Sequence, residues 1–175
     1  GVLSRWRFES PSAGEGRVRV RDVSPSEDLS FEDQVRLFAS CDVLASPHGS
    51  QNANVIFMRP GSLFIEINPP FFYYFSYEAM SRATGVHYVA SRRNVPAQPD
   101  DPATAAFLRE FGGLNDTECQ QNGRCRTTSR NLPFAVNISD LVVELSLALV
   151  TMALPDEHCE RLVECRSRRR GEPYL

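Results

Sequence analysis

The side chains best suited to chemistry gather in one turn, His48-Gly49-Ser50-Gln51, which follows a short apolar stretch and precedes a run that predicts a helix. The His48 imidazole can stabilise a diphosphate or serve as an acid, and Gly49 lets an anion approach the backbone closely. Further neutral hydrogen-bond donors are Ser50, Gln51, Asn52 and Asn54. A helix that begins directly after the turn presents unpaired backbone N–H groups and the positive end of its dipole. The turn therefore predicts a nucleotide diphosphate site, and a satisfied structural turn is the alternative.

Charged residues near this turn could complete such a site. Glu66 lies near the end of the next apolar stretch, where dinucleotide folds carry an acidic residue that binds the ribose diol. Arg36 and Arg59 are possible phosphate partners, because all 19 basic residues are arginine and none is lysine. For Glu66 the alternative is simple pairing with an arginine, and for each arginine it is a surface or structural role.

Hydrophobic periodicity predicts the elements that must position these residues. Ser30 is a suitable N-cap for a helix to about Ser40, with Asp33 three residues after the cap. The other predicted elements are strands at 17–23, 42–46, 62–67 and 86–90 and helices at 51–58 and 73–84, the last ended by Gly85. This alternation predicts an α/β fold, a Rossmann-like parallel sheet with crossover helices. Ligands bind outside the carboxyl ends of such strands, where His48 and Glu66 are expected.

The length suits one domain with an ordinary core. We predict the core of a Rossmann-like lobe over 1–91, an irregular disulfide-clipped excursion over 92–138, a packing helix over 139–158, and a basic tail with cysteines over 159–175. A net charge of -3 argues against nucleic acid as a partner. The lack of lysine excludes Schiff-base and P-loop chemistry. The sequence contains no run of about 18 apolar residues, the length that would predict a membrane span.

Cysteines and sequons indicate the compartment. Four of the five cysteines form two pairs with five residues between partners, Cys119 with Cys125 and Cys159 with Cys165. Neither pair has the spacing of a zinc site, so disulfides are favoured; three pairings are possible and two local loops are the simplest. Asn115 and Asn137 begin candidate N-glycosylation triplets. Together these features favour a lumenal or extracellular environment.

The strings FEDQV, DVLAS, HG, FMRPGS and LFIEI follow one another between Phe31 and Asn68. In this order they resemble the C-terminal part of family 61 glycosyltransferases, secretory-pathway enzymes that include plant xylosyltransferases and animal N-acetylglucosaminyltransferases. The resemblance implies one lobe of a GT-B fold that holds the nucleotide sugar. It also implies transfer from a UDP-sugar to a hydroxyl of a glycan or glycoprotein, with inversion and without a metal or other cofactor, in the Golgi or endoplasmic reticulum lumen or after secretion.

The resemblance also assigns roles to individual residues. It implies that the diphosphate is contacted by His48, Gly49, Ser50 and Gln51, that Asn54 supports the turn and that Glu66 binds ribose. The catalytic base is expected from a missing N-terminal lobe, so no catalytic residue is assigned and this piece alone is predicted to be inactive. An acceptor lobe and a membrane anchor are expected upstream of Gly1.

Two other functions are alternatives to sugar transfer. Gln51 stands where the family usually has a second glycine, which favours a noncatalytic lumenal or extracellular module that keeps the fold. A serine hydrolase that uses Ser50 with His48 or His87 is the weaker alternative, because the chain has no Gly-x-Ser-x-Gly motif.

Overall fold

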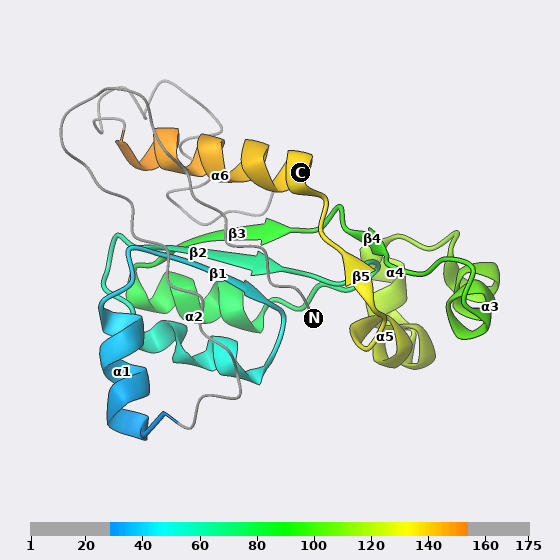
Figure 1. Cartoon of the computed structure of the whole chain (residues 1–175), viewed down its shortest axis with the longest axis horizontal. Helices are drawn as coiled ribbons and strands as arrows, with labels where there is room; N and C mark the ends of the chain where they lie inside the picture. The colour runs from blue at the N-terminus through cyan, green and yellow to red at the C-terminus, as the bar shows by residue number, and fades with distance from the viewer. Residues whose placement is uncertain (1–28, 154–175) are drawn as a thin grey trace.

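The structure is a computed structural model and describes residues 29–153 (Figure 1). The strand predicted at 17–23, the Cys159 and Cys165 pair and the basic tail at 159–175 lie outside the described residues. Within the described range the predicted alternation of helices and strands is confirmed, and the fold class is α/β.

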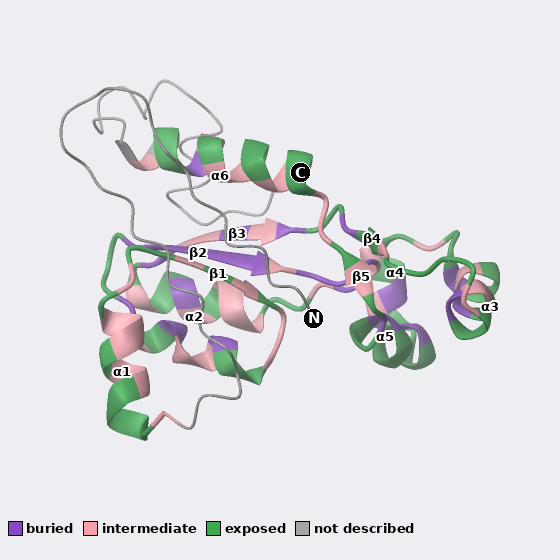
Figure 2. Ribbon diagram, in the orientation of Figure 1, coloured by how far each residue is buried: buried purple, intermediate pink, exposed green. Residues whose placement is uncertain are grey.

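A parallel three-stranded sheet in the order β1-β2-β3 forms the centre of the described part (Figure 1). The strands are β1 (Val43–Pro47), β2 (Leu63–Ile67) and β3 (His87–Ser91). The middle strand is buried from Leu63 to Glu66, whereas β1 alternates between exposed and half-buried residues. Figure 2 shows this concentration of burial along β2. A parallel sheet joined by crossover helices is compatible with a Rossmann-like fold.

Helices cover both faces of the sheet. One face carries α1 (Phe31–Ala39), the 3-10 helix η1 (Ser50–Phe57) and α2 (Ser76–Thr84), and the other carries α6 (Ile138–Ala153) (Figure 1). Successive side chains of a strand point to opposite faces, so Phe64 packs with η1 and α2 while Leu63 and Ile65 pack with α6. Glu66 shares the face of Phe64, which places its carboxylate on the side of η1 and α2.

Local sequence signals set the helix boundaries. The Ser30 hydroxyl accepts from the backbone N–H of Asp33 at 3.1 Å, which confirms the predicted cap of α1. The end of α2 at Gly85 is also confirmed, and the positive φ of 70° there suits glycine. The helix predicted over 51–58 begins at Ser50 and is 3-10 rather than α-helical. Asparagine and β-branched residues fill half of its eight positions, and both disfavour the α-helix.

The segment expected to be irregular holds regular structure. It contains the antiparallel strands β4 (Val95–Pro96) and β5 (Phe134–Ala135) and the helices α3 (Pro102–Phe111), α4 (Asp116–Gln121) and α5 (Gly123–Arg130). Each helix is capped by a side chain that accepts from backbone N–H groups: Asp101, Asn115 and Asn122. A disulfide joins Cys119 to Cys125, which confirms this local pairing.

The packing helix predicted over 139–158 is α6, which begins at Ile138. Its residues Leu141, Leu145 and Met152 pack around the buried Ala148 against the sheet. None of the helices in residues 29–153 is long and apolar enough to cross a membrane.

Candidate functional site

Three side chains from neighbouring strands meet at the Glu66 carboxylate, near the carboxyl edge of the sheet. His48 and Glu66 lie at the carboxyl ends of their strands, whereas Tyr88 is the second residue of its strand and its long side chain reaches Glu66 from there. His48 follows β1, Glu66 lies in β2 and Tyr88 lies in β3. His48 Nδ1 lies 2.5 Å from Glu66 Oε1, and the Tyr88 hydroxyl donates to Glu66 Oε2. The register between β1 and β2 brings His48 beside Glu66. Glu66 pairs with Ser46 of β1, two residues before His48, and the backbone N–H of His48 continues the ladder to Ile67 O at 2.9 Å.

Burial makes this cluster electrostatically unusual. The Glu66 side chain is fully buried and that of His48 is 11% exposed. Burial first, and then the charge of Glu66 and the hydrogen bond to it, raise the pKa of Tyr88 far above its ordinary value. The Tyr88 hydroxyl therefore stays protonated and donates to the carboxylate. Burial and the Glu66 charge raise the pKa of Tyr77 in the same direction.

Aromatic rings fix the orientation of the His48 imidazole. The ring of Phe72 packs against it edge-on with centroids 4.6 Å apart, and the ring of Tyr77 lies 5.3 Å away. Because Nδ1 faces Glu66, Nε2 is the imidazole nitrogen left for a ligand, and no hydrogen bond joins it to any described residue. The arrangement can present one polar nitrogen at the edge of the sheet in a fixed direction.

The turn beyond His48 is braced by amide side chains. Gln51 donates to Pro47 O at 3.2 Å and folds back over the turn; a Cβ at Gly49 would lie 2.3 Å from Gln51 Oε1. Asn52 is buried, and its Nδ2 donates to the same Pro47 oxygen at 3.0 Å. Thus Asn52, rather than Asn54, holds the turn.

Asn54 and the two arginines are placed elsewhere. Asn54 donates to Gln34 Oε1 at 3.3 Å and so ties η1 to α1. Arg59 forms an exposed ion pair of 2.6 Å with Asp42. Asp42 lies just before β1, whereas His48 lies just after that strand. Five residues of β1 separate the two ends by about 16 Å, so Arg59 lies at the opposite edge of the sheet. Arg36 lies in the last turn of α1 and pairs with Glu32 at 2.6 Å on that helix. The structure therefore does not bring either arginine to the His48 turn.

The other predicted roles have clear structural settings. The Ser50 hydroxyl makes no hydrogen bond to any described residue, so the serine hydrolase hypothesis gains no support from His48 or His87. Asn115 is exposed, whereas Asn137 is half-buried and its Nδ2 donates to Asp140 at 3.0 Å. Within residues 29–153 no group of three or more His, Cys, Asp or Glu side chains could hold a metal ion.

The sequence analysis missed the aromatic members of the site. Tyr88 lies in a predicted strand, and the strand periodicity gives its face only once the register against Glu66 is known. Phe72 lies two residues after a Pro-Pro pair, and Tyr77 is the second residue of α2. No local sequence pattern brings either ring to His48.

The fold and the site define an α/β lobe with a polar turn and a helix N-terminus at the carboxyl edge of its sheet. The Glycosyltransferase 61 family model matches residues 15–65, which include the His48 turn, end one residue before Glu66 and begin before the described residues. The predicted resemblance to family 61 glycosyltransferases is thereby confirmed over this segment.

Two relatives carry the comparison further along the chain. A protein of Tetraodon nigroviridis named "Protein O-linked-mannose beta-1,4-N-acetylglucosaminyltransferase 2" is 27% identical over 143 residues, which cover 75% of this chain and 23% of that protein. A protein of the same name from Xenopus laevis is 31% identical over 118 residues, 61% of this chain and 19% of that protein. The chain thus spans about a fifth of the length of these curated relatives. No solved structure matches it significantly.

Proposed function

We propose that this chain is the nucleotide-sugar-binding lobe of a family 61 glycosyltransferase with GT-B architecture. The observation that carries the proposal is the His48 turn at the carboxyl edge of the sheet, which lies in the segment that the family model matches. The buried Glu66, one residue beyond that segment, holds the His48 ring. The names of the two relatives favour N-acetylglucosamine as the transferred sugar and an O-linked mannose as the acceptor. We therefore propose UDP-N-acetylglucosamine as the donor and a mannosylated glycoprotein as the acceptor.

The diphosphate would be held without lysine. His48 Nε2, when the imidazole is protonated, would donate to a phosphate oxygen, and the first backbone N–H groups of η1 would supply neutral donors at the positive end of a helix. A phosphate that approaches the Gly49 backbone would have to displace the Gln51 side chain, which lies against it. Glu66 would accept from His48 Nδ1 and hold the ring. Both Glu66 oxygens already have hydrogen-bond partners, so the ribose-binding role that the sequence suggests for Glu66 stays a prediction.

The reaction would be a single displacement at the anomeric carbon with inversion. The acceptor oxygen forms the new bond as the bond from the anomeric carbon to the diphosphate breaks, and UDP leaves with the electron pair. His48 and the N–H groups of η1 would stabilise the charge that develops on the leaving phosphate, without a metal ion. The acceptor proton goes to a base outside this chain, so the chain alone is proposed to bind donor but not to transfer sugar.

The compartment proposed is the Golgi or endoplasmic reticulum lumen or the extracellular space. The disulfide between Cys119 and Cys125 supports it, because such bonds persist in oxidising compartments.

Calorimetry with UDP and UDP-N-acetylglucosamine on the 175-residue chain tests the proposal. We expect both ligands to bind, and His48→Ala to weaken UDP binding by about 1–3 kcal/mol, about five- to 150-fold, at nearly unchanged melting temperature. His87→Ala is the matched control, because His87 begins β3 at the opposite edge of the sheet. No binding at millimolar ligand by the folded chain would refute the proposal.

A noncatalytic module that keeps the fold is the second candidate. The observation that favours it is the Gln51 side chain, which lies against Gly49 where a ligand would approach the backbone. Here UDP would bind to the full-length protein without sugar transfer, and Gln51→Gly would increase UDP affinity in the isolated chain. Sugar transfer by the full-length protein excludes this alternative.

A further inference from the structure

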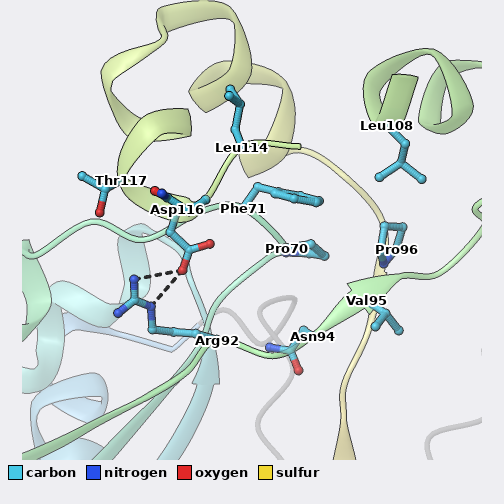
Figure 3. A pocket seen from close by; sticks show the side chains of 11 residues that line it. Pro70, Phe71, Arg92, Asn94, Val95, Pro96, Leu108, Leu114, Asp116 and Thr117 are labelled. Carbon is cyan, nitrogen blue, oxygen red and sulfur yellow. Dashed lines mark hydrogen bonds and ion pairs between the residues drawn. The ribbon is translucent and has the colours of Figure 1, made fainter. Parts of the chain in front are cut away.

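A pocket of about 590 Å³ opens beyond the carboxyl ends of β2 and β3 (Figure 3). Its apolar wall is formed by Pro70 and Phe71, which follow β2, by Leu108 of α3, and by Leu114 between α3 and α4. The volume lies within the range of small-molecule sites, about 300–1,000 Å³, and a mostly apolar wall with a few polar groups is typical of them. His48, Glu66 and Tyr88 are not among the residues that line this pocket, so it is separate from the His48 site.

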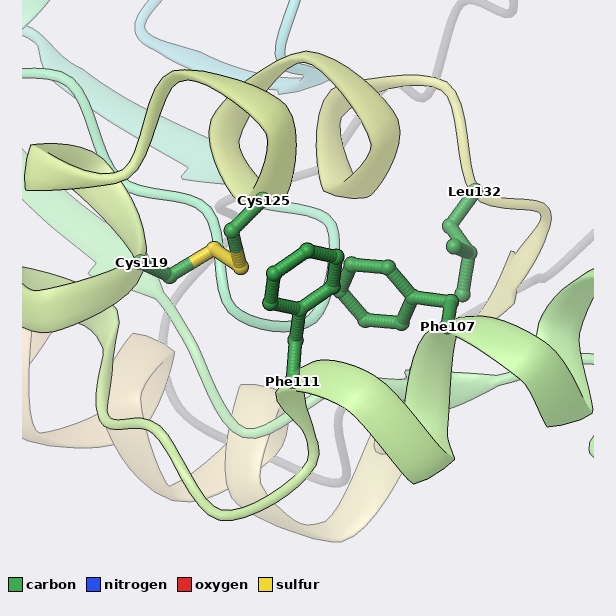
Figure 4. Packing of buried hydrophobic residues seen from close by; sticks show 5 residues of the cluster. All are labelled: Phe107, Phe111, Cys119, Cys125 and Leu132. Atoms are coloured by element: carbon green, nitrogen blue, oxygen red, sulfur yellow. A yellow bond between two sulfur atoms is a disulfide. The ribbon is translucent and has the colours of Figure 1, made fainter.

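Phe71 presents its ring to the pocket from a strained backbone. Its φ is 61°, in the left-handed region that a bulky residue rarely adopts. Packing holds it there, because the Phe71 ring meets that of Phe107 at 5.6 Å. Phe107 belongs to the buried cluster with the disulfide beside the pocket (Figure 4). The fold thus keeps an aromatic face at the pocket wall at the expense of backbone strain.

The polar side of the pocket is neutral and offers both donors and acceptors. Arg92 donates through Nε and Nη2 to Asp116 Oδ2, at 3.0 and 2.9 Å (Figure 3). Asp116 Oδ1 makes no hydrogen bond within the described residues and is left to accept one. Because the guanidinium charge is already paired, the pocket suits a neutral ligand better than a free anion. A carboxylate oxygen beside guanidinium N–H groups suits the vicinal hydroxyls of a sugar ring.

The pocket lies next to the His48 turn. Phe71 lines it, and the adjacent residue Phe72 packs on the His48 ring. Parallel strands lie about 4.8 Å apart, so the end of β3 is about 10 Å from the end of β1, the scale of one diphosphate and the ring that it carries. A nucleotide sugar has a neutral ring on either side of its diphosphate, and ribose and N-acetylglucosamine both carry a vicinal diol.

We infer that this pocket binds one of the two diol-bearing rings of the donor, its apolar side against Phe71 and its hydroxyls at Asp116 Oδ1 and Arg92. The inference rests on the proposed function, because the neighbouring diphosphate site is what brings the ring to the pocket. It adds Phe71, Arg92 and Asp116 to the donor site and gives the diol a carboxylate that is accessible, unlike the buried Glu66.

Titration of the 175-residue chain with uridine, UDP and UDP-N-acetylglucosamine, followed by calorimetry or NMR, tests the inference. In Asp116→Asn the amide oxygen can still accept from Arg92, whereas the amide nitrogen replaces Oδ1, so a hydrogen-bond acceptor becomes a donor. Phe71→Asn removes the ring and tolerates positive φ. The matched control is Asp42→Asn, which alters an exposed Asp–Arg pair at the opposite edge of the sheet. Thermal melting checks that each variant is folded.

We expect each pocket variant to weaken UDP-N-acetylglucosamine binding about tenfold, the equivalent of one well-made hydrogen bond or stacked ring, and the control to leave it unchanged. If uridine and UDP are weakened equally, the pocket holds the nucleoside; if only the UDP-sugar is weakened, it holds the hexose. Unchanged affinity of both folded pocket variants for all three ligands overturns the inference and leaves the proposed function standing. A wild-type chain that binds none of them overturns both.

Discussion

The substitution Glu66→Gln separates the charge of this buried residue from its shape. The glutamine can turn its oxygen toward His48 Nδ1–H and its amide toward Tyr88, whose hydroxyl oxygen can accept from it. The contacts that hold the imidazole are then kept in number, and the side chain stays in a space that is fully buried in the wild type. What disappears is the negative charge 2.5 Å from His48.

The loss follows from the type of hydrogen bond. A bond to a charged group contributes about 1.5–3 kcal/mol and a neutral one about 0.5–1.5 kcal/mol, so the substitution weakens the hold on protonated His48 by about 1–1.5 kcal/mol. We therefore expect UDP to bind about five- to tenfold more weakly. Stability should change little, because the amide can keep both hydrogen bonds and the desolvation cost of the buried carboxylate disappears with its charge.

Calorimetry with UDP and thermal melting of the same samples measure the two effects. Glu78→Gln is the matched control: Glu78 also accepts from a tyrosine, Tyr73, but its other partner is Arg82 rather than a histidine. Unchanged UDP affinity of Glu66→Gln would refute the positioning of His48 by charge. A fall in melting temperature that parallels the loss of affinity would show instead that Glu66 serves the fold.

Three further predictions concern stability and modification. Replacing both Cys119 and Cys125 with serine should lower the free energy of unfolding by about 2 kcal/mol, because the disulfide closes a short loop; urea unfolding followed by circular dichroism measures this, and an equal midpoint for the variant would contradict it. The raised pKa values of Tyr73, Tyr77 and Tyr88 mean that the unfolded chain loses its tyrosine protons first, so stability is fully present below pH 10.0 and should fall as pH rises above it. Tyr88→Phe should flatten this fall in unfolding measurements at pH 8 to about 11, and identical slopes would count against the shift. Expressed through the secretory pathway, the chain should carry a glycan at Asn115 more fully than at Asn137, because Asn115 is exposed and its Nδ2 makes no hydrogen bond to a described residue, whereas Asn137 is half-buried and its Nδ2 donates to Asp140. Glycosidase-sensitive gel shifts of Asn115→Gln and Asn137→Gln measure this, and a shift that depends on Asn137 alone would contradict it.

The sequence predicts the sheet well because its signals there are local. The apolar runs of β1, β2 and β3 and the stops at Gly61 and Gly85 are all visible within a few residues, and each strand lies within one residue of its predicted range. The position of His48 at the carboxyl edge follows from the same alternation of strands and helices. The partners of His48 do not follow, because the register between strands and the packing of Phe72 are long-range properties.

The helices α4 and α5 do not follow from the sequence, for a different reason. Asn115 and Glu118 form a capping box, with the Glu118 side chain accepting from the Asn115 backbone at 2.8 Å, and this signal is present in the sequence. The surrounding glycines and asparagines resemble loop composition, and α4 and α5 have only six and eight residues. Helices this short are stable only when packed, here through the buried disulfide and Phe107, which no local pattern reveals. The pocket that they help to form was therefore also invisible in the sequence.

Among the described residues, two glutamates accept from a tyrosine, and they differ in how their charge is compensated. Glu78 lies on α2 near solvent, and its charge is paired with Arg82 at 2.6 Å. Glu66 is fully buried in an apolar strand, and among the described residues His48 is the side chain in contact with it that can carry a positive charge. Burying a carboxylate costs several kcal/mol unless a charged partner compensates it, and an apolar residue would serve the core better. Protonated His48 is such a partner, and it is also the form in which Nε2 would donate to the phosphate of the proposed donor. In the proposed donor complex the imidazolium would therefore contact two negative groups, Glu66 through Nδ1 and a phosphate through Nε2.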